Sequence, residues 1–152
     1  ESMAAHRKVD VAEAKRTAME LFEKLIFKDG ERVWNSYPFE LSGGMNQRAS
    51  IAIAMLMNPS VIMADEPTSA LDVAVQRQVV DEMLRVRELF GTAIIIVTHD
   101  IGVVSAMADS ILVLQNGHVM EYGNAKDVLE SPQNDYTRKL LSAVPRLRRE
   151  KS

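Results

Sequence analysis

Apolar residues recur at helical spacing in the first third of the chain. The acceptor at Asp10 and the acid at Glu13 have the spacing of a capping box, and the apolar positions after them predict a helix to about residue 26. A second helix is predicted over residues 43–57, which are largely apolar and precede an Asn-Pro pair. Residues 28–39 predict a loop or short turns. Because no strand pattern occurs in the first forty or so residues, they are expected to form a separate helical piece.

Two short runs in the middle of the chain are apolar at every position. Residues 61–64 and 93–97 therefore predict buried parallel strands. An amphipathic helix predicted over residues 73–90 separates them, with Gly91 as its C-cap. Strands that alternate with helices in this way indicate an α/β fold with a mostly parallel sheet.

The last third of the chain predicts smaller elements. A short helix is expected after Asp100 and a strand over residues 111–114. The Asn-Gly pair at residues 116–117 predicts a two-residue hairpin turn into a further strand. Short helices near Ala125 and Tyr136 are expected to end the fold.

Length and composition narrow the class of protein. The chain has 152 residues, of which 47% are hydrophobic and 26% charged, so it has the size and the core of one domain. A net charge of −3 argues against a dedicated nucleic-acid binder. The lack of cysteine excludes disulfides, thiol catalysis and cysteine-ligated metals. No apolar run approaches the ~20 residues that span a bilayer, so a soluble, cytoplasmic chain is expected, and its start at Glu1 suggests a processed or shortened protein.

An acidic pair, Asp65-Glu66, follows the predicted strand at residues 61–64. The carboxyl ends of parallel strands are where open α/β sheets bind ligands. One carboxylate there can hold Mg²⁺ on a nucleotide, while its neighbour orients or activates the attacking water. The alternative is a solvated acidic turn, and the pair alone does not decide between the two.

Two other segments carry candidate chemistry. Ser42-Gly43-Gly44 opens the second predicted helix, where glycines allow a phosphate to approach and the first backbone amides attract an anion. The same residues also suit an ordinary helix cap. His99 follows the second predicted strand, where an imidazole can donate to a γ-phosphate or a catalytic water, or serve a structural role.

Taken together, the order and spacing of four segments resemble the ATP-binding cassette (ABC) family from about residue 37 to residue 141. The segments resemble the family's signature motif, its Walker B strand, its D-loop and its switch histidine, in the order Leu41-Ser42-Gly43-Gly44-Met45-Asn46-Gln47-Arg48, Val61-Ile62-Met63-Ala64-Asp65-Glu66-Pro67-Thr68, Ser69-Ala70-Leu71-Asp72 and Thr98-His99-Asp100. Gln47 and Arg48, at the end of the signature segment, follow the family pattern and are expected to brace the helix that the signature opens.

The resemblance implies an ATPase that uses ATP and Mg²⁺. By this resemblance, Asp65 would bind Mg²⁺ through water and Glu66 would be the general base. His99 would contact the γ-phosphate of ATP. These roles come from the resemblance and not from the spacing of the residues.

The resemblance also implies a partner, because the signature motif of the family binds the ATP that a second ATPase subunit holds. Ser42, Gly43, Gly44 and Met45 would make this contact, although Met45 stands where glutamine is usual. Asp72 would link the two ATP sites across the dimer of subunits. The loss of the glutamine removes one polar contact but leaves the backbone donors.

Finer features are similar to the peptide/nickel importer branch of the family. They lie at residues 37–40, at residues 71–76 and in the tail from residue 132 to residue 145, although Phe39 stands where the branch often has histidine. The implied protein energises a membrane importer of peptides, nickel or similar small solutes. Its partners would be transmembrane permease subunits and no nucleic acid, and it would lie peripherally on the cytoplasmic face of the cell membrane.

The phosphate-binding loop of the family, Gly-x-x-x-x-Gly-Lys-Ser/Thr, does not occur among the seven glycines of the sequence. The chain is therefore expected to be the C-terminal part of a longer subunit. Residues 1–58 would belong to its helical subdomain, residues 59–123 to the ATPase core, and residues 124–152 to a helical tail. Such a chain should bind ATP weakly, hydrolyse none at a useful rate, and expose sheet surface that favours self-association.

Two other interpretations stay open. One is a soluble cassette ATPase of DNA repair or translation, although the long coiled coils or basic arms of those proteins are not evident here. The other is a natural interaction module without the phosphate-binding loop. Dimerisation without nucleotide binding would favour this second interpretation.

Overall fold

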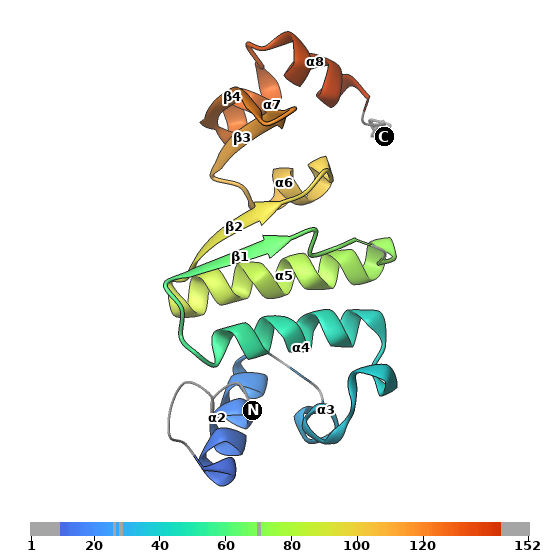
Figure 1. The fold of residues 1–152 in the computed structure, drawn as a ribbon, viewed down its shortest axis with the longest axis vertical. Coiled ribbons are helices and arrows are strands. Elements are labelled where there is room, and N and C mark those ends of the chain that lie inside the picture. The colour runs from blue at the N-terminus through green and yellow to red at the C-terminus, as the bar shows by residue number, and fades with distance from the viewer. Residues whose placement is uncertain (1–9, 26, 28, 70, 144–152) are drawn as a thin grey trace, which may run out of the picture. The chain divides into compact units, whose positions relative to one another are not determined.

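The computed structural model describes residues 10–25, 27, 29–69 and 71–143 (Figure 1). The chain divides into two compact units, Glu1–Val97 and Thr98–Ser152. This division differs from the three segments expected from the sequence, which remain a prediction. Among the described residues, no helix combines the length and the apolar character that crossing a membrane requires.

The first unit contains five of the predicted elements and two short helices that were not predicted. The Asp10 carboxylate caps the first helix, accepting a hydrogen bond from the backbone N–H of Glu13 at 2.7 Å, as the capping box predicts. In chain order the elements are α2 (Val11–Lys24), α3 (Gly30–Asn35), the 3₁₀ helix η1 (Pro38–Glu40), α4 (Gly43–Met55), β1 (Val61–Asp65), α5 (Val73–Phe90) and β2 (Ala93–Val97).

Two expectations for the beginning of the chain are wrong. The segment predicted as a loop or short turns contains α3, whose six residues are too few for a helical period to show in the sequence. The first helices are also not a separate piece, because they share a hydrophobic core with α4 and α5. That core consists of Leu21, Phe22, Leu25, Val33, Ala52, Met55 and Val86.

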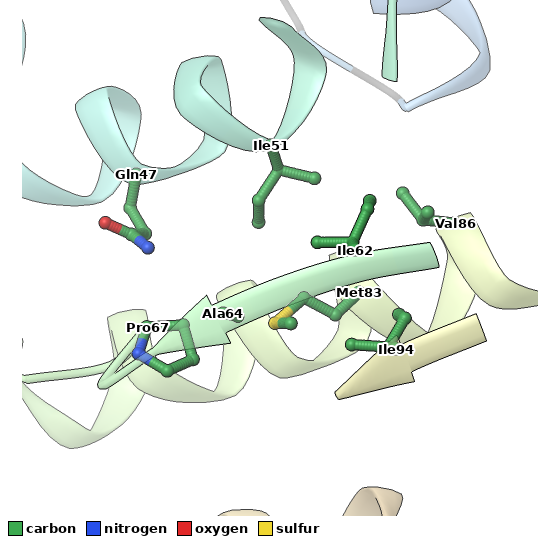
Figure 2. Close-up of a pocket in the computed structure, with 8 residues that line it drawn as sticks. All are labelled: Gln47, Ile51, Ile62, Ala64, Pro67, Met83, Val86 and Ile94. Carbon is green, nitrogen blue, oxygen red and sulfur yellow. The ribbon is translucent and has the colours of Figure 1, made fainter. Parts of the chain in front are cut away.

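The two strands of the first unit are parallel, as predicted, and pair from Val61 opposite Ala93 to Asp65 opposite Val97. On one face, α4 and α5 cover the sheet and enclose a pocket of about 40 Å³, which is visible in Figure 2. The other face is open, since the side chain of Met63 is 76% exposed. The expectation that both strands are buried is therefore wrong for the described residues, because helices of this unit cover only one face.

The second unit is built around an antiparallel hairpin. Its turn residues Asn116 and Gly117 have φ angles of 51° and 78°, the left-handed conformation that an Asn-Gly hairpin turn requires. Val113 and Val128 are buried beneath one face of the hairpin. The predicted elements are all present, as α6 (Ile101–Met107), β3 (Ser110–Gln115), β4 (His118–Asn124), α7 (Ala125–Glu130) and α8 (Asp135–Ser142). The Val144-Pro145 part of the predicted tail lies outside the described residues.

Candidate functional site

Three of the four predicted motifs lie at one corner of the first unit. Helices α4 and α5 run parallel (Figure 1). The contacts between them advance in the same direction along both helices, from Gly44 with Val75 to Arg48 with Glu82. Their N-termini therefore lie at the same end of the unit as the carboxyl end of β1. The structure brings together the signature segment, the acidic pair and the D-loop segment.

The two glycines at the start of α4 have different surroundings. A β-carbon at Gly43 would meet Leu71 Cδ2 at 3.5 Å, an ordinary contact, whereas one at Gly44 would lie 2.4 Å from Val75 Cγ1. The prediction gave both glycines the same reason, the approach of a phosphate. The structure adds a packing reason for Gly44, since only glycine lets α4 lie this close to α5, and the phosphate contact of both glycines remains a prediction.

Side-chain hydrogen bonds cap the N-terminus of α4 and hold the turn that precedes it. Ser42 Oγ accepts a hydrogen bond from the backbone N–H of Met45 at 3.3 Å. Asn46 Nδ2 donates to the carbonyl of Pro38 at 2.7 Å and so holds the turn that leads into the helix. This role of Asn46 was not predicted, because nothing in a single sequence distinguishes it from a solvated polar residue. The nucleotide contacts of Ser42 and Met45 remain predictions.

The acidic pair ends β1 in an unusual backbone conformation. Glu66 has a φ of 46°, and its N–H donates to the carbonyl of Val97 at 2.8 Å. A non-glycine residue in the left-handed region is strained, and such residues concentrate at functional sites. The strained residue is the one that the sequence predicts as the general base.

The carboxylates of Asp65 and Glu66 suit Mg²⁺ that is bound together with a nucleotide. Among the described residues no three histidine, cysteine, aspartate or glutamate side chains gather to hold a metal. Mg²⁺ commonly binds through one or two carboxylates, with water and substrate phosphates completing its shell. Asp65 and Glu66 therefore fit an ion that arrives with a nucleotide, and not an ion in a cage of protein side chains.

The D-loop segment is held by the start of α5. The carboxylate of Asp72 caps this helix, accepting a hydrogen bond from the backbone N–H of Val75 at 2.9 Å. Thr68 is 2% exposed, and its carbonyl accepts a hydrogen bond from Gln76 Nε2 at 3.2 Å. Asp72 thus has a structural role that the prediction did not include, and its predicted link between two ATP sites stays a prediction.

His99 belongs to the second unit, just after the end of β2 in the chain. Asp100 caps α6 by accepting hydrogen bonds from the backbone N–H groups of Gly102 at 2.7 Å and Val103 at 3.3 Å. Glu66 belongs to the other unit, so the two predicted catalytic residues are not brought together by either unit alone. The predicted contact of His99 with a γ-phosphate stays a prediction.

The acidic pair does not line either of two hollows found among the described residues. The 40 Å³ pocket lies between the sheet and the helices α4 and α5, and Gln47 lines it from α4 (Figure 2). It is far too small for a nucleotide. A larger hollow of about 580 Å³ is lined by α2, α3 and α4, with Trp34 among its mostly apolar lining residues.

The motifs agree with comparisons to known proteins. Residues 1–69 match the family described as ABC transporter, and residues 120–152 match the family described as the C-terminal region of oligopeptide/dipeptide transporters. The chain is 42% identical to the oligopeptide transport ATP-binding protein OppD of Salmonella typhimurium and 40% identical to the oligopeptide transport ATP-binding protein AmiE of Streptococcus pneumoniae. Each match covers 97% of this chain, but 44% of OppD and 41% of AmiE. The chain thus spans less than half the length of these relatives.

Solved structures show the same relationship. The chain is similar to cbiO1 from Clostridium perfringens, part of the ABC transporter complex cbiONQ, with a TM-score of 0.72 and 28% identity over 94% of this chain and 55% of that one. It is also similar to the ATP-binding cassette MJ0796 in a dimeric post-hydrolysis state bound to ADP and Pi, with a TM-score of 0.65 and 32% identity over 79% of this chain and 50% of that one. On the agreement of motifs, relatives and fold, the chain belongs to the ATP-binding cassette (ABC) transporter family.

Proposed function

We propose that this chain is part of an ATP-binding subunit that energises the import of peptides across a membrane. The observation that carries the proposal is the convergence of the signature segment, the acidic pair and the D-loop segment at one corner of the first unit. The names of OppD and AmiE, both oligopeptide transport ATP-binding proteins, support peptides over nickel as the solute. The match of residues 120–152 to the oligopeptide/dipeptide transporter family supports the same choice.

In this proposal, Asp65 would hold the Mg²⁺ of a bound nucleotide, and the ion would neutralise charge on the phosphates. Glu66 accepts a proton from the water that attacks the γ-phosphate. His99 contacts a γ-phosphate, the role that the family resemblance implies for it. The left-handed backbone of Glu66 supports its part, because strained positions concentrate at functional sites.

The remaining residues act across a dimer of subunits. Ser42, Gly43, Gly44 and Met45 present the N-terminus of α4 to the nucleotide that a second subunit holds, where backbone N–H groups and the helix dipole favour an anion. Asp72, in the neighbouring D-loop segment, links the two ATP sites across the dimer of subunits. We propose permease subunits as the membrane partners, and the cytoplasmic face of the cell membrane as the location.

ATP hydrolysis should be measured for the 152-residue chain and for the protein translated from the uninterrupted reading frame around it. We expect turnover only from the longer protein, and we expect Glu66→Gln to lower it by at least about a hundredfold, the usual scale of general-base catalysis. Glu20→Gln, at an exposed position of α2, is the matched control and should leave turnover unchanged. Full activity of the Glu66→Gln protein would refute the assignment of the general base.

A second candidate function is a nucleotide-independent interaction module. The open face of the parallel sheet favours it, since Met63 is 76% exposed and Val97 is 56% exposed. Sedimentation of the chain over a range of concentrations, with and without Mg²⁺-ATP, separates the two functions. A dimer that forms equally well without nucleotide, together with no effect of Glu66→Gln in the longer protein, would favour the module.

A further inference from the structure

Arg48 joins three segments of the first unit through its guanidinium group. Its Nε and one terminal nitrogen lie 3.1 and 3.0 Å from Glu82 Oε2 on α5. The same terminal nitrogen donates to the carbonyl of Leu25, the C-cap of α2, at 3.1 Å. The group also lies over the ring of Phe27, 4.4 Å from its centre. One side chain of α4 therefore touches α5 and the end of α2 together.

The stability of the fold does not explain this pair. The Glu82 side chain is 7% exposed, and its Oε1 is buried without a hydrogen-bond partner among the described residues. Burial raises the pKa of the Glu82 carboxyl above the ordinary glutamate value, although the charge and hydrogen bonds of Arg48 oppose this rise. Replacing a buried ion pair by apolar residues is often neutral or stabilising, because the desolvation cost disappears. Unlike apolar contacts, the hydrogen bonds of such a pair have a preferred geometry, so they fix the orientation of the two helices that they join.

Arg48 and Glu82 lie near the N-terminus of α4, where the orientation of α4 against α5 positions the signature segment. Arg48 is four residues after Gly44, about one helical turn, so both residues project from neighbouring turns of α4 toward α5. Contact of Gly44 with Val75 sets how closely the two helices approach but leaves α4 free to slide or rotate. Directional hydrogen bonds between Arg48 and Glu82 remove that freedom, one turn from the N-terminus of α4.

We propose that Arg48 and Glu82 are positioning residues that fix the register of α4 against α5 and so hold the turn at residues 42–45 in place. The proposal rests on the proposed function for the use of this turn, but not for its physical test. The pairing specifies orientation at the cost of desolvation. It connects the signature segment to the helix that follows the D-loop segment.

Amide hydrogen exchange of the 152-residue chain, without nucleotide, tests the proposal. The reporters are the N–H groups of Met45 and Asn46, which are bonded to Ser42 Oγ at 3.3 Å and to the Ser42 carbonyl at 2.9 Å. In the Arg48→Met/Glu82→Leu variant we expect exchange at both amides to rise on the order of tenfold, while the urea midpoint followed by Trp34 fluorescence is unchanged or higher. A merely structural pair would shift both readouts together.

Two further variants keep the result interpretable. Glu82→Gln retains an oxygen acceptor for Arg48 and should keep exchange near the wild-type rate. The matched control, Lys15→Met/Glu31→Leu, removes an exposed ion pair of 2.9 Å and should leave both amides unchanged. Unchanged exchange in the Arg48→Met/Glu82→Leu variant would overturn the proposal. Because no nucleotide is present, this result is independent of whether Glu66→Gln abolishes ATP hydrolysis.

Discussion

The two strand pairs of the chain are built differently. Strands β3 and β4 are joined by Asn116-Gly117 alone, so the hairpin forms through contacts between near neighbours in the sequence. Strands β1 and β2 are parallel and are separated by the 18-residue helix α5, so they pair only after that helix has folded back. The local pair ends in an ordinary turn, whereas the non-local pair ends in the acidic residues Asp65 and Glu66.

The difference is clearest in the left-handed residues. Asn116 and Gly117 are the residue types that adopt positive φ readily, and the hairpin turn requires it. Glu66 adopts a φ of 46° although its residue type does not favour it. The residue types thus suit the backbone of the hairpin turn, but glutamate does not suit the left-handed backbone at the end of β1. A left-handed residue that does not suit its turn is a stronger indication of function than one that does.

The largest expected effect separates the covered face of the parallel pair from its open face. Met83, which is 2% exposed, packs beneath the sheet, and Met83→Ala should lower the free energy of unfolding of the first unit by about 2–5 kcal/mol. The fluorescence of Trp34, the single tryptophan, follows this unit in urea. The hairpin, monitored by amide exchange in β3 and β4, should be unaffected.

Met63→Ala is the matched control for that experiment. Met63 is 76% exposed on the open face, so its truncation should change the free energy of unfolding by no more than about 0.5 kcal/mol. Equal losses from the two methionines would show that the open face is covered in solution. That outcome would direct attention to a second copy of the chain.

The next effect concerns the close approach of α4 and α5. Gly44→Ala places a β-carbon 2.4 Å from Val75 Cγ1, and a β-branched side chain has little freedom to move away. We expect a loss of about 1–3 kcal/mol in the free energy of unfolding, measured by urea titration. Gly43→Ala, whose nearest contact is 3.5 Å, should be neutral or slightly stabilising, because alanine favours the helix.

A smaller effect is expected in the hairpin turn. Gly117 has a φ of 78°, and a β-carbon there would meet nothing within 4 Å, so Gly117→Ala has only a backbone cost. We expect the amides of β3 and β4 to lose about 1 kcal/mol of protection against exchange. The Trp34 transition of the first unit should not move. A shift of that transition would mean that the two units unfold together.

The smallest effect is a difference in the response to acid. Burial raises the pKa of Glu82 in the first unit, so its contribution to stability is fully present below the ordinary glutamate value and is lost as the pH rises through the raised pKa. In the second unit, the neighbouring Thr137 hydroxyl and hydrogen bonds from the backbone N–H groups of Gln133 and Asn134 lower the pKa of Glu121. The contribution of Glu121 is present above the ordinary value and is lost as the pH falls through the lowered pKa.

Urea unfolding between pH 6 and pH 3 checks these signs when each variant is compared with the parent chain. Glu82→Gln should remove a pH dependence of the Trp34 transition, and Glu121→Gln should remove one of opposite sign from the exchange of the hairpin amides. Differences of the same sign in both units would contradict the assignment. Other titrating groups cancel in each comparison with the parent chain.

Local signals made much of the fold predictable from the sequence. The cap at Asp10, the Asn-Gly turn and the strands β1 and β2 each depend on a few neighbouring residues, and each of these elements is confirmed, although the burial of both strands is not. Helix α3 was missed because six residues do not display a period. The sharing of one core by α2, α4 and α5 was missed because it depends on contacts between distant segments.

The candidate site divides in the same way. The identities of Asp65, Glu66 and Ser42 follow from motifs, but their convergence depends on the parallel packing of α4 and α5. The pairing of Arg48 with Glu82, 34 residues apart, could not be predicted, since an isolated glutamate in an amphipathic helix looks like a solvated one. Gly44 also has a packing role that its motif did not indicate, because its close approach to Val75 depends on a residue of another helix.

The conformation of Glu66 has a consequence for selection. A glycine at position 66 would relieve a left-handed backbone that costs about 1 kcal/mol or more, and would remove the carboxylate at the same time. A laboratory selection that rewards only expression or heat resistance should therefore enrich Glu66→Gly. The selected proteins should be more stable than the parent and inactive in ATP hydrolysis. Persistence of glutamate under such a selection would mean that the side chain also supports the fold, whereas its rapid loss would mark the position as one that only activity maintains.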